Sequence, residues 1–507
     1  MRDDFDRAAK GSSALDATME RQWCFEAARY VGDEGAAILW DLERFFDTVD
    51  FEVLLSQAMA WSYPRRLMVL ALLQHMAPRT LTYKGVCSQC VAVLRGVLPG
   101  CMHAVPFVKA LLKEQLGQVQ RAAEQVRQTS YVDDFAQLAL GHMVDVVDSL
   151  VAAGTRYVHG MSLLKLTLST KSVMVATSPR LESLLRKTLA SAGVDLKVAR
   201  APRDLGHGLV ARSGRRVPLQ RQRRGKAAPR LRAIQRICGI TPVARKLVRT
   251  GYMPQCLWGH AAMGLAPTVL RTIRWKIAQV FAPRLKGRCL ATVLALALGP
   301  YEDPQITLTM QMVGAWLSMW RRCRDLHARG RVAWRAAVAR VRASVAAGNS
   351  PWLWIGGPMS AMVATLEEQG WQLDFPEVWR DPGGQQWAID DETPIAQVTI
   401  MVRTYAAQYV WKQACAEGHL PGGLGDGVNW RVSLRWLGKL RSQGRSREAA
   451  VLEMFLAGGC WTEARKHEQL HVQPGSCDLC QQPAPSIQHV VWQCPSTVEA
   501  RWGAAAS

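Results

Sequence analysis

The sequence has 507 residues, enough for roughly two to four domains that each bury a hydrophobic core. Hydrophobic residues make up 49% and charged residues 21%, a globular composition that excludes a disordered or fibrous chain. The 63 lysines and arginines outnumber the 41 acids and give a net charge of +22, which favours a polyanionic partner, nucleic acid before membrane.

The sequence carries no signal for secretion or membrane insertion. The N-terminus is charged where a signal peptide would be apolar, and the most apolar stretch, 290–298, is too short to span a bilayer. Thirteen cysteines without a secretory signal favour free thiols and a metal site over a disulfide framework. We therefore expect an intracellular protein with no membrane partner.

The N-terminal part predicts a helix, a strand and two more helices. The apolar run 36–40 predicts a buried strand that ends on Asp41. Asp50 can cap a helix whose apolar residues share one face, and Pro64 ends that helix before another at 65–76.

A two-stranded ribbon and a long helix are predicted next. The ribbon strands are expected at 81–84 and 91–94, with a turn near Gly85, and the helix at about 102–128. Cysteines and a histidine in this part offer another set of metal ligands, but we predict buried thiols here: Cys87, Cys90, Cys101 and His103.

Short alternating apolar runs flank Asp133 and Asp134, which predicts a β-hairpin with the acidic pair at its turn. A helix is expected at 142–154, followed by a strand-like stretch at 163–175 that is interrupted at 169–171. The order of these elements predicts an α+β fold in which helices back one antiparallel sheet.

From 197 to 249 the composition becomes strongly basic. The run has almost no acids to pair with its arginines, so we predict phosphate contact with nucleic acid; the alternative is a solvated helical face. The arginines assigned to this contact are Arg212, Arg215, Arg216, Arg221, Arg223 and Arg224.

The chain beyond residue 300 is predicted to be mostly helical. Fourteen of the nineteen tryptophans lie between Trp316 and Trp502, and their irregular spacing predicts core packing rather than base stacking. Clusters of Gly and Pro at 348–358 and 421–427 predict linkers or long loops.

Three aspartates are candidates for a metal centre. Asp41 closes a hydrophobic strand, and Asp133 and Asp134 lie at a hairpin turn. Adjacent carboxylates repel each other, and two Mg²⁺ ions neutralise such acids where phosphate chemistry takes place. The alternative is a solvated Asp-Asp turn without chemistry.

The segments that contain these aspartates resemble two catalytic motifs of the reverse transcriptases of non-LTR retrotransposons. The first runs from Asp41 to Val49, an Asp followed by aromatic-Asp-x-Val, and the second is the aromatic-x-Asp-Asp box from Tyr131 to Asp134. Further segments are similar to later motifs of that family and follow in its order: 96–101, 168–172 and 204–206. The resemblance covers about residues 10–210, under half of the chain.

The resemblance implies a reverse-transcriptase palm with partial fingers. It implies RNA-directed DNA polymerase activity, in which a primer 3′-hydroxyl attacks a dNTP with the help of two Mg²⁺ ions. Carried over by position, Asp41 and Asp133 would bind both ions, Asp134 would support them, and Lys171 would neutralise or protonate the leaving pyrophosphate.

The resemblance also implies that residues at other positions contact the nucleotide and the primer. Phe46 matches the aromatic residue that crowds a ribose 2′-hydroxyl, which implies deoxynucleotides; the alternative is an ordinary core phenylalanine. Gly100 belongs to the nucleotide-binding motif and Gly206 to the turn that grips the primer end. Pro99 departs from the family, which usually has a glutamine there that touches the incoming nucleotide.

The stretch 11–17 looks like the tail of an early fingers motif, so the basic triphosphate-binding residues expected before it are missing. Together with Pro99, this predicts a truncated and decayed copy. The resemblance implies an RNA template, a DNA primer and dNTPs as partners, a nuclear location, and a separate chain that supplies an endonuclease or the missing fingers. The alternative function is a catalytically inactive relic that only binds nucleic acid and zinc.

Cys477-x2-Cys480-x8-His489-x4-Cys494 predicts a tetrahedral zinc site, because a CxxC turn aims two thiolates at one point and the later His and Cys close the shell. It resembles the zinc-binding segment that follows the polymerase in these retroelements. The domains expected along the chain are a fingers remnant and palm at 1–200, a basic thumb-like segment at 201–300, a Trp-rich helical region of unknown role at 301–470, and a zinc module at 471–507.

Overall fold

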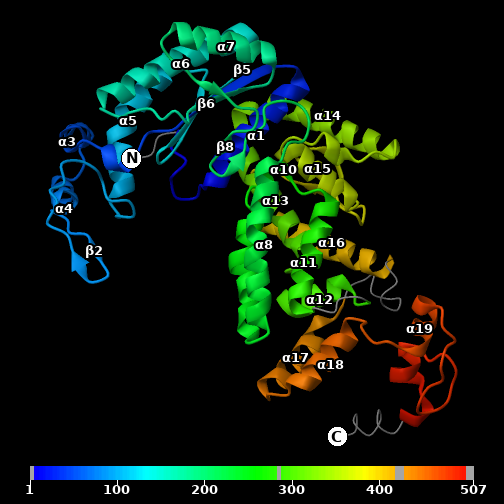
Figure 1. The fold of residues 1–507 in the computed structure, drawn as a ribbon. Coiled ribbons are helices and arrows are strands. Elements are labelled where there is room, and N and C mark those ends of the chain that lie inside the picture. Colours follow the sequence, from blue (N-terminus) through cyan, green and yellow to red (C-terminus); the bar gives the residue numbers. More distant parts are fainter. Residues whose placement is uncertain (1–4, 283–286, 417–427, 498–507) are drawn as a thin grey trace. The chain divides into compact units, whose positions relative to one another are not determined.

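The structure is a computed structural model, and it describes residues 5–282, 287–416 and 428–497. The chain forms two compact units, and each is assembled from segments far apart in sequence (Figure 1). The described residues of 1–229, 251–266 and 308–402 form the first unit, and those of 230–250, 267–307 and 403–507 form the second. These units cut across the consecutive domains expected from the sequence.

The first unit is built on a five-stranded sheet in the order β4-β5-β1-β6-β7. β1 pairs antiparallel with β5 and β6, β4 and β5 form a hairpin, and β6 pairs in parallel with β7. The expected strand before Asp41 and the expected hairpin are confirmed. The strands are β1 Glu34–Trp40, β4 Arg127–Tyr131, β5 Asp134–Gly141, β6 Val173–Ala176 and β7 Lys197–Val198.

Helices cover both faces of this sheet, and the predicted α+β class is confirmed (Figure 1). The side chains of Ile38 and Trp40 on β1 share a hydrophobic core with the helices on one face. The alternate position Gly35 faces Phe25, which belongs to the helix on the other face. The first face carries α5 Ala104–Ala122, α6 Met143–Leu163 and α7 Pro179–Ser191, and the second carries α1 Ala14–Val31.

A cluster of tryptophans joins α1 to the segment 308–402. The ring of Trp23 lies 5.9 Å from that of Trp316, and the ring of Trp316 lies 5.5 Å from that of Trp334. All three side chains are fully buried, so the prediction of core packing is confirmed for Trp316 and Trp334. The helices that carry the partners are α13 Pro304–Arg322 and α14 His327–Ala346, and α15 Pro358–Glu368 packs beside them.

Two helices after β1 begin as predicted. The Asp50 carboxylate accepts hydrogen bonds at 3.0 Å from the backbone N–H groups of Glu52 and Val53, which caps α3 Phe51–Ala60. Pro64 then precedes α4 Arg65–Met76. The cap satisfies backbone donors that would otherwise lack partners.

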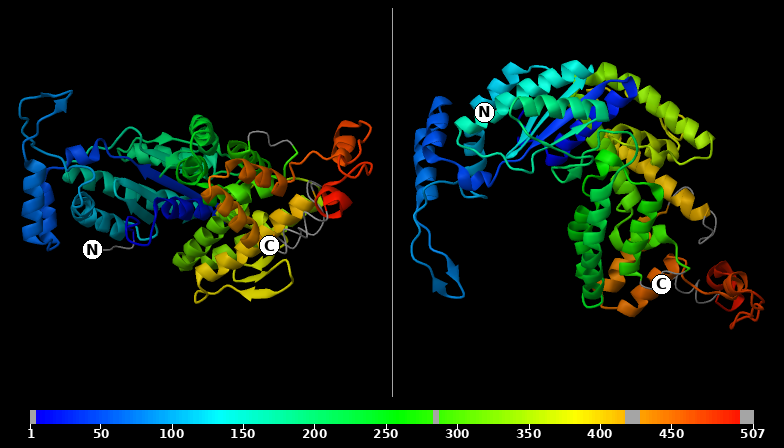
Figure 2. Two further views of the ribbon diagram at one scale, coloured as in Figure 1. Left: turned by 90° about the horizontal axis from the view of Figure 1, so that it is seen from below. Right: turned by 45° about the horizontal axis from the view of Figure 1, so that its top comes forward.

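The ribbon that follows α4 differs from the prediction. Its strands are β2 Thr82–Tyr83 and β3 Val86–Cys87, so the strand expected at 91–94 is wrong (Figure 2). Lys84 and Gly85 both have positive φ, 49° and 82°, and such a two-residue turn pairs the residues directly beside it. The prediction of buried thiols is also wrong, because Cys87 and Cys90 are exposed.

α6 and β6 also differ from the prediction. α6 continues to Leu163, beyond the expected end at Gly154, and the strand expected at 163–175 shortens to β6. Gly154 does not end the helix because it is a packing position: a Cβ there would lie 3.4 Å from Leu189 and 3.6 Å from Ile38. The glycine lets α6 approach the sheet closely.

The second unit is helical. Leu296 and Leu437 are buried in its small hydrophobic cluster, and a buried ion pair joins Arg274 to Asp303 with two contacts of 2.8 Å. Its principal helices are α11 Pro267–Phe281, α12 Leu290–Leu298, α17 Trp430–Ser442, α18 Ser446–Leu456 and α19 Glu463–Leu470. Across the described ranges, no helix combines the length and apolarity needed to cross a membrane.

Further elements complete the described chain. They include α2 Phe45–Thr48, β8 Arg203–Asp204, β9 His207–Gly208, α8 Pro218–Cys238, α9 Met253–Leu257, α10 His260–Met263, β10 Gln372–Phe375, β11 Val378–Arg380, β12 Gln386–Ala388 and α16 Ile395–Ala416. The basic run of the sequence therefore lies partly on the long helix α8.

Trp23→Ala should destabilise the first unit by about 3–5 kcal/mol, because it removes a fully buried ring from the tryptophan cluster. Urea unfolding followed by circular dichroism measures the change. Trp436→Ala is the control, since that ring is 51% exposed and its loss should cost less than about 0.5 kcal/mol. Equal losses from both variants would contradict the role of the cluster.

Candidate functional site

The register of the sheet brings the three predicted aspartates to one edge. Trp40, the last residue of β1, pairs with Phe135 on β5, so Asp41 follows directly beside the start of β5 at Asp134. Tyr131 pairs with Asp134, which leaves Val132 and Asp133 as the two turn residues. The hairpin turn therefore presents Asp133 and Asp134 next to Asp41.

The turn itself holds an unusual backbone conformation. Val132 has φ 61°, in the left-handed region that β-branched residues rarely adopt. Its side chain is half-buried against the core of the sheet, and the flanking pair Tyr131–Asp134 constrains both ends. Conformations of this kind persist where the surrounding structure imposes them, and they concentrate at functional sites.

The loop before β6 fixes Asp41 through its backbone. The Asp41 carbonyl accepts a hydrogen bond of 2.8 Å from Ser169 N–H, and Asp41 N–H donates to Ser172 Oγ at 3.0 Å. Lys171 lies between these two serines and is exposed. The position of Lys171 relative to Asp41 is thus set by hydrogen bonds on either side of it.

A cavity of about 770 Å³ opens where these segments meet. Six of the residues predicted from the sequence line it: Asp41, Asp133, Asp134, Lys171, Gly206 and Arg223. The lining residues that were not predicted as site residues include three with charged side chains and one with an indole: Arg21, Arg203, Asp204 and Trp258. The cavity therefore combines carboxylates with cationic and aromatic side chains.

The turn between β8 and β9 forms one wall of this cavity. Arg223 donates to the Gly206 carbonyl at 2.8 Å, and the Trp258 indole N–H donates to the Leu205 carbonyl at 3.3 Å. Gly206 has φ 81°, and a Cβ there would lie 2.6 Å from the Arg223 guanidinium. The positive φ favours glycine at this position, and a larger residue would also displace the Arg223 guanidinium from the turn.

Arg21 and Asp204 form a buried ion pair beside the aspartates. The guanidinium reaches both Asp204 oxygens, from Nε at 2.9 Å and from Nη2 at 2.6 Å, and Nη1 donates to Thr129 Oγ1. Burial alone would lower the pKa of Arg21, but the Asp204 carboxylate more than offsets this and the pKa is raised. The sequence carries no signal that singles out Arg21, because α1 contains four other charged residues.

The two hairpin aspartates are harder to ionise than isolated carboxyl groups. Burial, followed by the charges of Asp133, Asp204 and Asp41, raises the pKa of Asp134 to about 6. Burial and the charge of Asp41 also raise the pKa of Asp133. A bound cation would relieve this repulsion, so the donor set suits hard cations that prefer oxygen ligands.

Two residues predicted to bind nucleotide are not among those that line the cavity. Phe46 is half-buried, its ring lies 5.5 Å from that of Phe45, and its carbonyl accepts a hydrogen bond of 2.7 Å from Val97 N–H. Gly100 is exposed with φ 87°. The packing of Phe46 is that of a residue at the margin of the core.

The predicted phosphate-binding arginines have different surroundings. Arg212 pairs with Glu182, and Arg215 donates to the Gly264 carbonyl at 2.9 Å while its guanidinium lies 5.0 Å from the Trp352 ring centre. Burial, together with the charge of Arg224, lowers the pKa of Arg215 to about 10. The exposed members are Arg216 and Arg221, with Arg224 half-buried.

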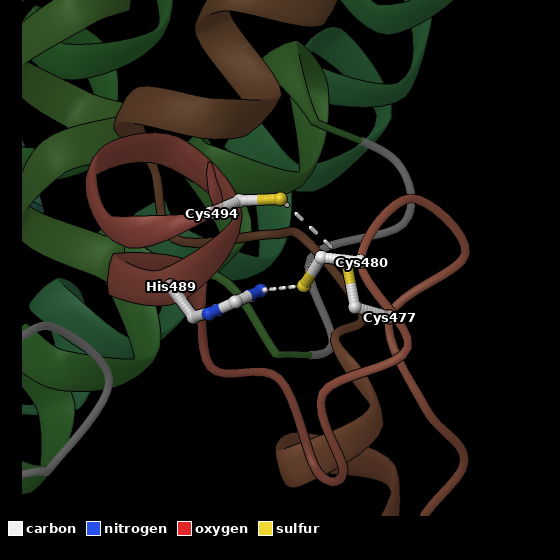
Figure 3. Close-up of side chains that lie close together, drawn as sticks. All are labelled: Cys477, Cys480, His489 and Cys494. Atoms are coloured by element: carbon white, nitrogen blue, oxygen red, sulfur yellow. Dashed lines mark hydrogen bonds between the residues drawn. The ribbon is translucent and has the colours of Figure 1, made fainter. Parts of the chain in front are cut away.

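The second unit contains the predicted Cys/His cluster, which could hold a metal ion such as zinc (Figure 3). The Sγ atoms of Cys477 and Cys494 are 4.0 Å apart, and Cys480 Sγ lies 3.3 Å from His489 Nε2. All four ligand atoms lie within 4.8 Å of one another. A zinc–sulfur bond of about 2.3 Å places tetrahedral ligands roughly 3.8 Å apart, close to these separations.

The pKa values of two thiols in this cluster are shifted by neighbouring groups. The backbone N–H groups of Cys480 and Leu479, followed by His489, lower the pKa of Cys477 to about 6. The pKa of Cys480 is raised: the Gln482 N–H opposes this shift, but burial and the neighbouring Cys477 and Cys494 outweigh it. A metal cation would let several thiolates ionise together.

The two candidate metal sites differ in how closely their possible ligand atoms are grouped. Within the described ranges, the Cys/His cluster is the one group of three or more candidate ligands whose atoms all lie within 4.8 Å. Asp41, Asp133 and Asp134 line one cavity but do not form such a group. The exposed Cys87 and Cys90 do not belong to such a group either.

Asp134→Asn should stabilise the metal-free protein above about pH 6. The folded state holds the Asp134 proton more tightly than the unfolded state, whose pKa is near 3.8, so wild-type stability falls as the pH rises from about 4 to about 6. The variant's advantage should disappear below about pH 4, where both states are protonated. Urea midpoints in EDTA measure this, and Asp148→Asn on the exposed face of α6 is the control. A gain independent of pH would contradict the assignment.

Comparisons with known proteins do not identify the chain. No protein-family model matches it, and a search of curated proteins finds no match. The assignment of a function therefore depends on the motifs of the sequence and on the geometry of the two candidate sites.

Proposed function

We propose that this protein is an RNA-directed DNA polymerase of the non-LTR retroelement type. The observation that carries the proposal is the meeting of Asp41 with Asp133 and Asp134 at one cavity, from segments about ninety residues apart in the sequence. The order of the motifs supports it, and so do Lys171 and Gly206, which line the same cavity. The helix-covered sheet that carries the aspartates would be the polymerase palm.

The donor set would suit two Mg²⁺ ions, because the raised pKa values of Asp133 and Asp134 mean that these carboxylates need cations to remain ionised beside Asp41. Asp41 and Asp133 would hold the ions, with Asp134 as a supporting carboxylate. When bound, Mg²⁺ would favour ionisation of the primer 3′-hydroxyl and neutralise charge on the transferred phosphate. Lys171, exposed at the cavity, would donate a proton to the departing pyrophosphate.

The wall made by β8, β9 and Trp258 would hold the primer end. Arg223 and Trp258 fix the turn by donating to the Gly206 and Leu205 carbonyls, so the backbone of the turn presents a rigid surface to the cavity. Arg203 adds a positive charge on this wall. An RNA template, a DNA primer and dNTPs would be the partners, in the nucleus, with a separate chain to supply fingers or an endonuclease.

A second function is favoured by different observations. The Cys/His cluster and the exposed arginines Arg216 and Arg221 would be sufficient for a relic that binds zinc and nucleic acid without catalysis. Pro99 and the position of Phe46 away from the cavity lining favour this alternative. Primer extension distinguishes the two functions.

Extension of a DNA primer on an RNA template, with Mg²⁺ and dNTPs, should be weak for the wild type. Asp133→Asn should lower it by at least roughly 100-fold, because even a misplacement of about 1 Å costs that much. Asp148→Asn removes an exposed carboxylate from the same unit and should leave extension unchanged. Wild-type protein that neither extends a primer nor binds divalent ions through Asp133 would favour the relic.

The Cys/His cluster should bind one Zn²⁺ per chain, with Cys477, Cys480, His489 and Cys494 as ligands. Cys480→Ser should remove most of the zinc that elemental analysis detects, because serine is a poor zinc ligand. Cys87→Ser serves as the matched control, since Cys87 is exposed on the ribbon outside the cluster. Loss of zinc from the Cys87 variant, with retention by the Cys480 variant, would place the metal elsewhere.

A further inference from the structure

The buried pair of Arg21 and Asp204 connects three separate segments at the cavity. The two side chains are 4% and 5% exposed, so water does little to screen their charges. The guanidinium holds Asp204 through two hydrogen bonds and holds Thr129, on β4, through a third. A single side chain on α1 thereby ties the β8–β9 turn to the β4–β5 hairpin that carries Asp133.

Asp204 brings a fourth carboxylate to the cavity. It lines the same space as Asp41, Asp133 and Asp134, and its charge acts on Asp134. An unpaired Asp204 would attract cations toward the β8–β9 turn and away from Asp41. Arg21 instead neutralises Asp204 and donates one hydrogen bond to each of its oxygens, which makes them weaker ligands for a cation.

We propose that Arg21 is a positioning residue that keeps Asp204 out of the cation site and holds the β8–β9 turn against the catalytic hairpin. The inference deepens the proposed function and rests on its cation site at Asp41 and Asp133. The planar fork of the arginine reaches two carboxylate oxygens and Thr129 at once, whereas a lysine ammonium would still neutralise Asp204 but could not make all three contacts.

The test is a double-mutant cycle at Arg21 and Asp204 in the full-length, zinc-loaded protein. Its readout is the Mn²⁺ affinity, measured by electron paramagnetic resonance. Arg21→Gln releases a carboxylate and should tighten Mn²⁺ binding roughly five- to tenfold. Asp204→Asn leaves an unpaired guanidinium and should weaken it by a similar factor. The double variant has the wild-type net charge in the cavity and should return to within about twofold of wild type.

The control is a matched ion pair in the second unit. Arg274 and Asp303 are similarly buried and share two hydrogen bonds of 2.8 Å, but they do not line the cavity. Arg274→Gln should therefore destabilise its unit without changing Mn²⁺ affinity. Arg21→Lys keeps the positive charge and should stay within about twofold of wild-type affinity.

A purely structural role for Arg21 predicts unchanged or weaker Mn²⁺ binding in both single variants, and that result would overturn the inference. If Arg21→Gln does not fold, Asp204→Asn and the double variant provide the same contrast, and equal affinities for these two would overturn it. Wild-type protein whose Mn²⁺ binding is insensitive to Asp133→Asn would refute the proposed cation site instead, so the two failures are distinguishable.

Discussion

The antiparallel pairing of β1 with β5 places Trp40 opposite Phe135, and the position of Asp41 follows from that register. A slip of one residue would turn Ile38 and Trp40 toward α1 and expel them from the core they share with α6. Trp40 resists such a slip because its indole N–H donates to Gln137 Oε1 at 2.9 Å and its ring lies 4.8 Å from that of Tyr157. Core packing therefore sets the geometry of the acidic cavity.

Helix α1 organises the first unit through buried charges as well as apolar contacts. Glu20 pairs with Arg7 and Arg127, and Glu26 accepts hydrogen bonds of 2.8 and 2.9 Å from the backbone N–H groups of Met359 and Ser360 at the start of α15. A buried charge without its partner is costly, so each of these segments must dock for the others to be stable. This explains why residues 308–402 belong to the same unit as the sheet.

Local signals in the sequence were sufficient for the elements that build the site. The apolar run before Asp41, the Asp50 cap and the CxxC turn each depend on residues close together in the chain, and the structure confirms them. The second ribbon strand was predicted at the wrong residues because the two-residue turn at Lys84 and Gly85 pairs the residues directly beside it. Contacts such as Arg21 with Asp204, which are 183 residues apart, leave no local pattern. Side chains that act through distant partners are therefore the part of a site that sequence patterns miss.

The charges of the chain act in opposite directions at long and short range. A net charge of +22 attracts polyanions, whereas the carboxylates of Asp41, Asp133 and Asp134 repel phosphate groups at contact. Under the proposed function, a divalent cation in the cavity would remove this conflict, so cation and phosphate binding there would be linked and each would strengthen the other equally. The Cys/His cluster cannot supply this cation, because thiolates select soft or borderline metals while carboxylates select hard ones. Under the proposed function the two candidate sites would therefore have separate roles: a metal at the Cys/His cluster would order that part of the chain, and a cation in the cavity would bring phosphate groups into contact with the aspartates.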